Sequence, residues 1–325
     1  MNINLISFII PTLNRKNDLL RLLDSIKKAS AYYYVVWEAI IVDQSNKLNI
    51  EDFQKYSEVK IISSKIMGLS INRNRGVQQS IGDLLIFIDD DCVVQNDYFE
   101  QLIGGIKKYP DSNVFCGRLL ELETNNPFLP LFAINNDKII GQNDFGYFMG
   151  STHLIKKSLW IKYLLKYQED LGAGTKNNAG EETFLFFDLL SKDEKVIYLG
   201  KMVYKHPAQQ SLPWRKRLGY SKGNGVVFTR IFFEIKPNLR EFWFPFILPL
   251  LKSFPNTLIT LFFLVTRLNL LIRFIISKNS KLTYTAINKL QKPPSEYFYY
   301  FIGNVIGILS ETKAQIFRKR AKNGK

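Results

Sequence analysis

The chain has 325 residues, of which 46% are hydrophobic and 22% charged, an ordinary balance for a globular protein with one large domain or two small ones. Its two cysteines, Cys92 and Cys116, lie in apolar stretches without metal-ligand spacing, which favours reduced thiols in the core over a single disulfide. The start of the sequence shows no basic leader and no cleavage site, so we expect no signal peptide.

The basic excess lies in the last third of the chain. Residues 1–205 contain 24 basic and 25 acidic side chains, a net charge of −1, whereas residues 206–325 contain 20 and 4, a net charge of +16. A basic segment beside a neutral one points to an anionic surface, either a membrane or a nucleic acid. The same third is rich in Phe, Trp, Leu and Ile. This mixture suits a lipid interface better than a nucleic-acid groove.

Strand and helix patterns alternate over the first two hundred residues. Residues 5–10 predict a strand that stops at Pro11, and a helix follows from about Asn14, which we take as its N-cap. Further strands are expected at 39–43, 59–62, 84–88 and 196–204, with a helix over about 70–81.

Short, nearly all-apolar strands separated by helices predict an α/β fold with a mostly parallel sheet and helices on both faces. Ligands of such open sheets bind beyond the carboxyl ends of the strands. We therefore expect a nucleotide crevice formed by the loops at residues 12–15, 43–46 and 89–92.

The acidic triplet Asp89, Asp90 and Asp91 directly follows the apolar strand at 84–88 and is the most informative feature of the sequence. Three carboxylates at the end of a buried strand repel one another unless Mg²⁺, Mn²⁺ or a basic side chain neutralises them. A divalent metal and a phosphorylated ligand are therefore expected here. The alternative is a solvated acidic turn that begins a helix at residues 96–98.

Several segments, in order along the chain, resemble glycosyltransferase family 2, whose members have the GT-A fold. They are FIIPTLNR at 8–15, IVDQS at 41–45, GLSINRNRG at 68–76, FIDDD at 87–91, and QEDLGAG with GEET at 168–174 and 180–183. The resemblance covers residues 6 to about 225. It implies a Rossmann-like mixed, mostly parallel sheet with helices on both faces and a metal-dependent transferase that uses a nucleotide-diphosphate sugar, with a UDP-sugar favoured.

The same resemblance suggests the residues that bind the donor. Asp43 would accept hydrogen bonds from the base or ribose, its alternative role being that of a turn or N-cap aspartate. Arg73 would either screen phosphate charge or hold the triplet. The remaining donor-site residues are Pro11, Thr12, Arg15, Asp89 and Asp90.

The metal, Mn²⁺ or Mg²⁺, is expected to bind Asp91, with Asp89 reaching it directly or through water. His206 follows the strand at 196–204, where the family often has a histidine, and a neutral imidazole suits Mn²⁺ as a third ligand. The other histidine, His153, matches no family motif, and we favour a structural role for it.

Glu181 and Glu182 open an apolar helix, where a carboxylate is stabilised as the anion. The family commonly has Glu-Asp here and uses the second acid as the base. We therefore predict Glu182 as the base and keep Glu181 as the alternative, with a pure helix-capping role for the pair as the third interpretation. The preceding glycine-rich segment, 172–180, is expected to be a mobile loop that closes over the substrates.

The last third has a different composition, and we place a domain boundary between residues 1–235 and 236–325. Residues 236–325 should form a helical region that associates with a membrane or forms an oligomer. Residues 257–277 are long enough to span a bilayer. Because Arg267 would lie near the middle of that span, we prefer in-plane or partly buried helices. Apolar pieces at 242–249 and 297–309 and a basic end at 318–322 complete this region.

The sequence thus predicts an inverting glycosyltransferase at the cytoplasmic face of a membrane, attached peripherally or monotopically. It would act on a hydroxyl of a lipid-linked or polysaccharide acceptor. The alternatives are a nucleotide-sugar hydrolase or nucleotidyltransferase, and a non-catalytic membrane- or nucleic-acid-binding protein on the same fold. Of these two partners, a membrane and a nucleic acid, the nucleic acid is the less favoured.

Overall fold

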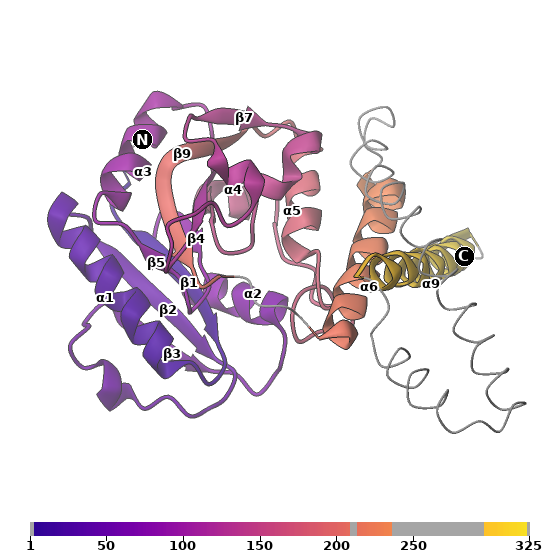
Figure 1. Cartoon of the computed structure of the whole chain (residues 1–325), viewed down its shortest axis with the longest axis horizontal. Coiled ribbons are helices and arrows are strands. Elements are labelled where there is room, and N and C mark those ends of the chain that lie inside the picture. Colours follow the sequence, from indigo (N-terminus) through magenta and orange to yellow (C-terminus); the bar gives the residue numbers. More distant parts are fainter. Residues whose placement is uncertain (1–2, 209–212, 236–295, 324–325) are drawn as a thin grey trace, which may run out of the picture. The chain divides into compact units, whose positions relative to one another are not determined.

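The structure of the chain is a computed structural model that describes residues 3–208, 213–235 and 296–323 (Figure 1). The chain divides into two compact units, Met1–Gln210 and Ser211–Lys325. We expected the boundary at residue 235, but helix α6 (Trp214–Arg230) already belongs to the second unit.

A nine-stranded sheet forms the core of the first unit. In spatial order its strands are β3 (Val59–Ser63), β2 (Trp37–Asp43), β1 (Ile6–Thr12), β4 (Leu84–Phe87), β8 (His153–Lys156), β6 (Val114–Glu121), β9 (Val196–His206) and β5 (Val93–Val94), with β7 (Lys138–Ile140) paired to β9.

The half of the sheet formed by β3, β2, β1 and β4 is parallel, as the apolar strand pattern predicts. All seven residues of β1 are buried, because helices cover both of its faces. In Figure 1, α1 (Lys16–Tyr33) and α3 (Tyr98–Lys108) lie on one face, and α2 (Leu69–Gln79) and α5 (Glu181–Leu190) on the other. A Cβ on Gly76 of α2 would lie 2.6 Å from Ile9, so this helix packs directly on β1.

The other half of the sheet mixes directions. β8 runs antiparallel between β4 and β6, and the short β5 runs antiparallel to the end of β9. β6 and β9 are parallel, with an irregularity in register at Gly117 and Arg118. This mixed, mostly parallel arrangement agrees with the predicted fold class. The shorter helices of the unit are α4 (Lys157–Lys162), η1 (Ile50–Phe53), η2 (Pro130–Ala133) and η3 (Gln142–Tyr147).

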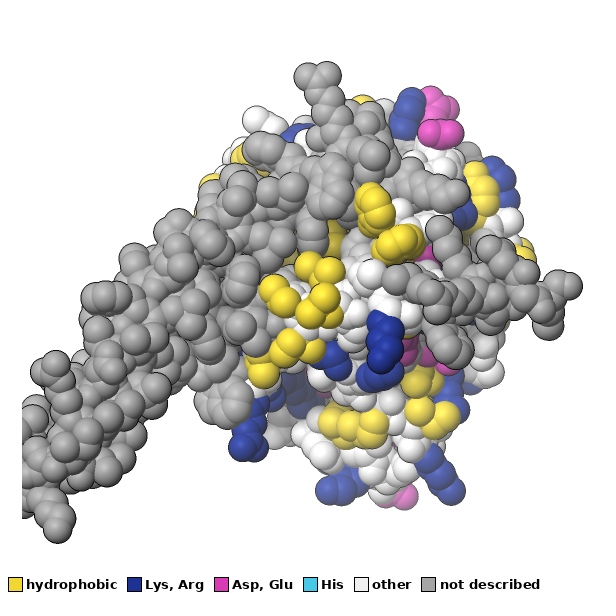
Figure 2. Space-filling model, turned by 90° about the vertical axis from the view of Figure 1, so that its right-hand side faces the viewer, with side chains coloured by type: hydrophobic (Ala, Val, Ile, Leu, Met, Phe, Trp, Pro, Cys, Tyr) yellow, Lys and Arg dark blue, Asp and Glu magenta, His cyan; other side chains and the backbone are white. Residues whose placement is uncertain are grey.

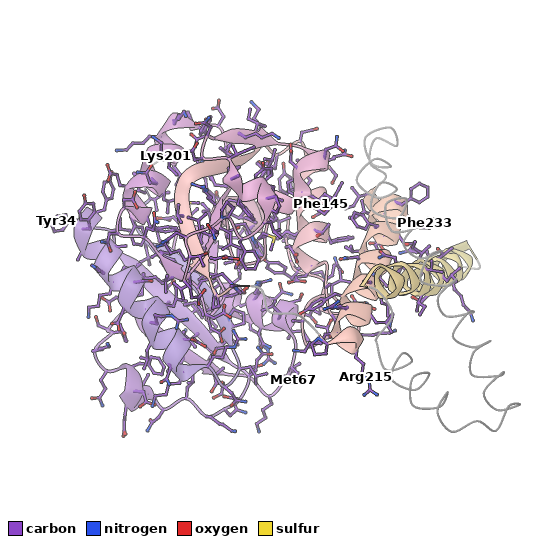
Figure 3. All side chains as sticks on the ribbon, viewed as in Figure 1. Tyr34, Met67, Phe145, Lys201, Arg215 and Phe233 are labelled. Atoms are coloured by element: carbon purple, nitrogen blue, oxygen red, sulfur yellow. The ribbon has the colours of Figure 1, made fainter. Side chains whose placement is uncertain are left out.

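A residue in the left-handed conformation lies next to each end of α1. The helix begins at Lys16 with Arg15 as its N-cap residue, so the predicted capping role of Asn14 is wrong. Asn14 instead has φ +57° and forms the turn after β1, a conformation that Asn tolerates. At the other end, Tyr34 takes the left-handed C-cap position and is 94% exposed (Figure 3).

The second unit contains α6, the short π-helix η4 (Ile231–Ile235) and α9 (Glu296–Asn323). α6 and α9 pack with their backbones in contact, since a Cβ on Gly307 would lie 2.2 Å from the carbonyl oxygen of Lys222. A buried ion pair between Arg230 Nε and Glu311 Oε1, at 3.2 Å, joins the same helices.

Among the residues that the structure describes, no helix is long and apolar enough to cross a membrane. The apolar stretches predicted at 242–249 and 257–277 lie outside the described residues, whereas the stretch at 297–309 is part of α9. Figure 2 shows one face of the molecule, on which the coloured side chains are mainly hydrophobic or basic.

Candidate functional site

The predicted crevice loops meet at the carboxyl edge of the parallel strands. The register pairs Thr12 at the end of β1 with Asp43 at the end of β2, and Ile9 with Phe87 in β4. The acidic triplet after β4 therefore lies beside the turn after β1, and Thr12 Oγ1 donates a 2.6 Å hydrogen bond to Asp90 Oδ2.

Asp43 is buried and organises its own turn. Its Oδ1 accepts hydrogen bonds from the amide and hydroxyl of Ser45, and its Oδ2 accepts them from the amides of Lys47 and Leu48, all at 2.6–3.0 Å. Burial favours a higher pKa, but these hydrogen bonds outweigh it and hold the pKa of Asp43 below its usual range. This is the geometry of the turn aspartate that we kept as the alternative, and its contact with a base or ribose stays a prediction.

The three carboxylates of the triplet have different neighbours. Asp90 is buried, and burial raises its pKa to about 6 despite the hydrogen bond from Thr12 and the charge of Arg15. Arg15 Nη1 pairs with Asp91 Oδ2 and lies 3.4 Å from Asp90 Oδ1. The half-exposed guanidinium of Arg15 is thus one of the basic groups that offset the charge of the triplet.

Arg73 neutralises the remaining carboxylate of the triplet, that of Asp89, and its side chain has no exposed surface. Its Nη2 lies 3.0 Å from Asp89 Oδ1 and donates to the carbonyl of Gly150 at 2.8 Å, while its Nη1 lies 3.0 Å from Glu181 Oε1. Burial alone would lower the pKa of Arg73, but the ring of Tyr167 and the carboxylates of Asp89 and Glu181 raise it. Arg73 therefore holds one carboxylate of the triplet, that of Asp89, and connects it to helix α5, while a contact with donor phosphate stays a prediction.

His153 belongs to the support of this arginine. Its ring is fully buried between Phe87 and Phe148, donates from Nδ1 to the carbonyl of Met149 and accepts a 2.5 Å hydrogen bond from Tyr167 at Nε2. Burial and the charge of Arg73 lower the pKa of His153 to about 3. It is a neutral structural histidine, the role that we favoured. Tyr167 was missed because a single aromatic residue in an irregular segment gives no sequence signal.

Glu181 and Glu182 begin α5, but their environments differ. Glu181 is buried and paired with Arg73, and a Cβ on Gly172 would lie 2.9 Å from its carboxylate, so this glycine leaves room for it. Glu182 is partly exposed, and burial of its carboxyl together with the charge of Glu181 raises its pKa well above the usual range. The pair thus contains one carboxylate held by Arg73 and one whose surroundings favour the protonated form.

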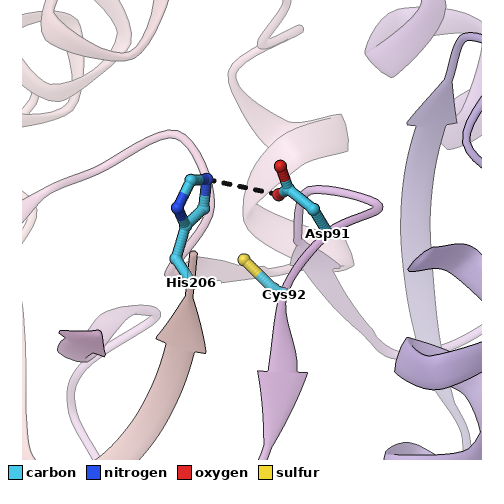
Figure 4. A group of neighbouring side chains, drawn as sticks. All are labelled: Asp91, Cys92 and His206. Atoms are coloured by element: carbon cyan, nitrogen blue, oxygen red, sulfur yellow. Dashed lines mark ion pairs between the residues drawn. The ribbon is translucent and has the colours of Figure 1, made fainter. Parts of the chain in front are cut away.

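His206 reaches the triplet from the far end of β9. β5 pairs Val93 with Lys205, so the next pair of residues along this antiparallel register is Cys92 and His206 (Figure 4). His206 Nδ1 lies 2.7 Å from the carbonyl oxygen of Pro207, which can only accept, so Nδ1 carries the hydrogen. In the neutral ring, the lone pair of Nε2 then faces Asp91 Oδ1, which lies 3.2 Å away.

These residues fit a divalent cation. Asp91 Oδ1 is buried without a hydrogen bond, and either a proton on His206 Nε2 or a cation bound between the two atoms would offset its charge. Neighbouring ligands of an octahedral ion with bonds of about 2.1 Å lie about 3.0 Å apart. The 3.2 Å between Asp91 Oδ1 and His206 Nε2 is close to that spacing.

A family model described as Glycosyl transferase family 2 matches residues 7–164. Haemophilus influenzae has a protein described as an uncharacterized glycosyltransferase that is 32% identical over 111 residues, covering 34% of this chain and 37% of that protein. The cholesterol galactosyltransferase of Borreliella burgdorferi is 28% identical over 145 residues, covering 42% and 39%. The chain therefore spans well under half the length of each of these relatives.

Among solved structures, the mannosyltransferase PcManGT from Pyrobaculum calidifontis, in complex with GDP-Man and Mn²⁺, is similar with a TM-score of 0.59. The match covers 96% of this chain and 88% of that one at 13% identity. At such low identity the likeness concerns the fold, and it agrees with the predicted GT-A type.

Proposed function

We propose, from the match of the glycosyl transferase family 2 model to residues 7–164, that the chain transfers a sugar from a nucleotide-diphosphate sugar to a hydroxyl group. One observation carries the proposal: a single buried guanidinium, that of Arg73, joins the acidic triplet through Asp89 to the pair Glu181–Glu182. The donor side and the base of the transfer would therefore lie at one edge of the sheet.

In this proposal Glu182 is the base. Its carboxylate would remove the proton of the acceptor hydroxyl as the oxygen attacks the anomeric carbon in line with the departing diphosphate, which inverts the configuration. Glu181 is already committed to Arg73, so it would position α5 rather than accept the proton. The raised pKa of Glu182 makes its carboxylate, once ionised, a stronger base than an ordinary carboxylate.

Asp91 and His206 would hold Mn²⁺ or Mg²⁺, with Asp89 or Asp90 reaching it through water, and the ion would offset the charge of the diphosphate. Arg15 is the half-exposed cation beside this position, and we propose that its guanidinium binds a phosphate oxygen of the donor. The hydrogen bond from Thr12 holds the Asp90 carboxylate beside both Arg15 and the proposed metal position.

We further propose a lipid-linked or polysaccharide acceptor at the cytoplasmic face of a membrane. The support is the net charge of +16 in residues 206–325 together with their Phe, Trp and Leu content. The similar protein of Borreliella burgdorferi is described as a cholesterol galactosyltransferase.

The test is release of nucleoside diphosphate by the full chain with Mn²⁺ across UDP-, GDP- and dTDP-sugars, with and without a membrane lipid extract. We expect one donor to be turned over faster when the extract is present, and EDTA to abolish the release. Release that is independent of any acceptor would support a nucleotide-sugar hydrolase instead. Absence of turnover with every donor, under conditions where Mn²⁺ binds, would argue against catalysis.

A further inference from the structure

Cys92 lies at the proposed metal position, where family resemblance gave it no role. The ligand atoms of Asp91, Cys92 and His206 all lie within 4.8 Å of one another, and Figure 4 shows the three side chains converging. We propose that these residues capture a soft divalent cation, Zn²⁺, through the Cys92 sulfur, and that the captured ion blocks the site. The capture stands by itself, and only the block rests on the proposed function.

The backbone fixes this cluster. The register of β5 and β9 sets Cys92 opposite His206, and directly opposed residues of an antiparallel pair have Cβ atoms about 4.5–5.5 Å apart on one face of the sheet. Asp91 is the neighbour of Cys92 in the chain, and its buried Oδ1 lies 3.2 Å from His206 Nε2 without a hydrogen bond. Small side-chain rotations would therefore bring all three atoms to one ion.

The donor set discriminates between cations. Sulfur, imidazole nitrogen and carboxylate oxygen are the ligands of Zn²⁺ in proteins, with bonds of about 2.0–2.3 Å. Mg²⁺ and Mn²⁺ favour oxygen ligands and do not need the thiol. The hard ions would then use Asp91 and His206 alone, while Zn²⁺ would add Cys92 and displace its thiol proton to solvent.

The extra ligand explains why the captured ion would block the site. A tetrahedral Zn²⁺ with three protein ligands keeps about one open position. An octahedral Mn²⁺ with two protein ligands keeps about four, enough for two diphosphate oxygens as well as water. A zinc ion held through Cys92 could therefore not chelate the donor diphosphate in the same way.

Binding is tested on the full chain with Co²⁺ and Cd²⁺ as spectroscopic probes and Zn²⁺ as competitor. We expect a sulfur-to-metal charge-transfer absorption in the wild type, its loss in both Cys92→Ser and Cys92→Ala, and its retention in Cys116→Ser. Cys116 is the matched control because it is equally buried but lies in β6, outside the cluster. Zn²⁺ affinity should fall at least tenfold in Cys92→Ser, and Mn²⁺ affinity less than threefold.

An absorption that survives in both Cys92 variants, or that disappears equally in Cys116→Ser, would overturn the proposal. Because a Cys92 variant can fail to fold, X-ray absorption of the Zn²⁺-loaded wild type gives an independent answer, with a sulfur neighbour at about 2.3 Å expected. A shell of only nitrogen and oxygen would refute the cluster.

The second experiment measures inhibition of sugar transfer by Zn²⁺. Zn²⁺ should inhibit sugar transfer in competition with Mn²⁺, and Cys92→Ser should weaken this inhibition at least tenfold. A wild type that shows the charge-transfer band but turns over no donor would contradict the proposed function and leave the zinc site standing. Zinc inhibition that is equal in wild type and Cys92→Ser would refute the block.

Discussion

At the scale of single residues, Glu181 and Glu182 are neighbours in the chain with opposite surroundings. Glu181 is fixed by Arg73, and Glu182 is partly exposed with a raised pKa. Glu182→Gln keeps the shape but removes proton acceptance, so turnover should fall by about 10²–10⁴-fold with donor affinity nearly unchanged. Steady-state rates and donor titrations measure the two effects.

The matched variant is Glu181→Gln. It should weaken the support of Arg73 and so lower the free energy of unfolding together with turnover. If Glu181→Gln, rather than Glu182→Gln, lowers turnover without loss of stability, then Glu181 is the base. If neither lowers it, the pair only caps α5.

Asp90 makes stability depend on pH. Its pKa is about 6 in the folded protein against 3.8 ordinarily, so between these values the folded state binds more protons than the unfolded one. This contribution to stability is complete below pH 3.8 and is lost as pH rises through about 6. Without divalent metal, Asp90→Asn should therefore gain stability over the wild type by about 1–3 kcal/mol between pH 4 and 7.

Chemical denaturation of both proteins at several pH values measures this gain. The asparagine can still accept the hydrogen bond from Thr12, so the comparison isolates the charge. A difference between the two proteins that stays constant from pH 4 to 7 would show that Asp90 titrates normally. Added Mn²⁺ should stabilise the wild type and reduce the gap.

At the scale of elements, Arg73 joins α2, the turn after β4 and the start of α5. Lysine cannot contact Asp89, Glu181 and the carbonyl of Gly150 together, so Arg73→Lys leaves buried polar groups unpaired. We expect the free energy of unfolding to fall by about 3 kcal/mol.

Arg75 provides the control on the same helix. It is partly exposed and donates to Ser64 Oγ at 2.7 Å, so Arg75→Lys should change stability by less than about 1 kcal/mol. Thermal or denaturant unfolding compares the two variants. Equal effects would mean that Arg73 does not join these elements as the contacts indicate.

The predictability of the fold differs between the two halves of the sheet. The parallel half followed from apolar strands such as 84–88, whose continuous burial gives a clear pattern. The strands β6 and β8 were not predicted. In the case of β8, the strand has only four residues and its pairing with β4 is set by tertiary packing. The Asn14 error has a local cause, since Asn suits both a helix N-cap and a left-handed turn.

Site residues could be predicted where they are adjacent in the sequence, but not where only the packing of distant segments brings them together. The acidic triplet stands out because three carboxylates need a counter-charge, and the structure supplies Arg15 and Arg73. The buried support from Tyr167 could not be found, because its contact with Arg73 joins distant parts of the chain. Cys92 was set aside for lack of a second cysteine at metal-ligand spacing, while its partner, His206, lies on another strand.

At the scale of the whole molecule, the two units differ in charge. Residues 1–210 carry a net charge of −1 and residues 211–325 a net charge of +16. Each Lys or Arg near an anionic bilayer contributes about 1 kcal/mol to binding, and salt weakens that attraction within a Debye length of about 10 Å at 0.1 M. Burial of apolar side chains is insensitive to salt of this strength.

We therefore expect the full chain to sediment with vesicles that contain anionic lipid, and 0.5 M salt to weaken this binding without removing it. Residues 1–210 alone should stay in the supernatant while keeping Asp43, Asp91, Glu182 and His206, so retained Mn²⁺ binding reports that this part is folded. Neutral vesicles separate the two contributions, because only the apolar one persists on them. If the full chain fails to bind either vesicle, the basic third serves packing or assembly, and a lipid-linked acceptor loses its main support.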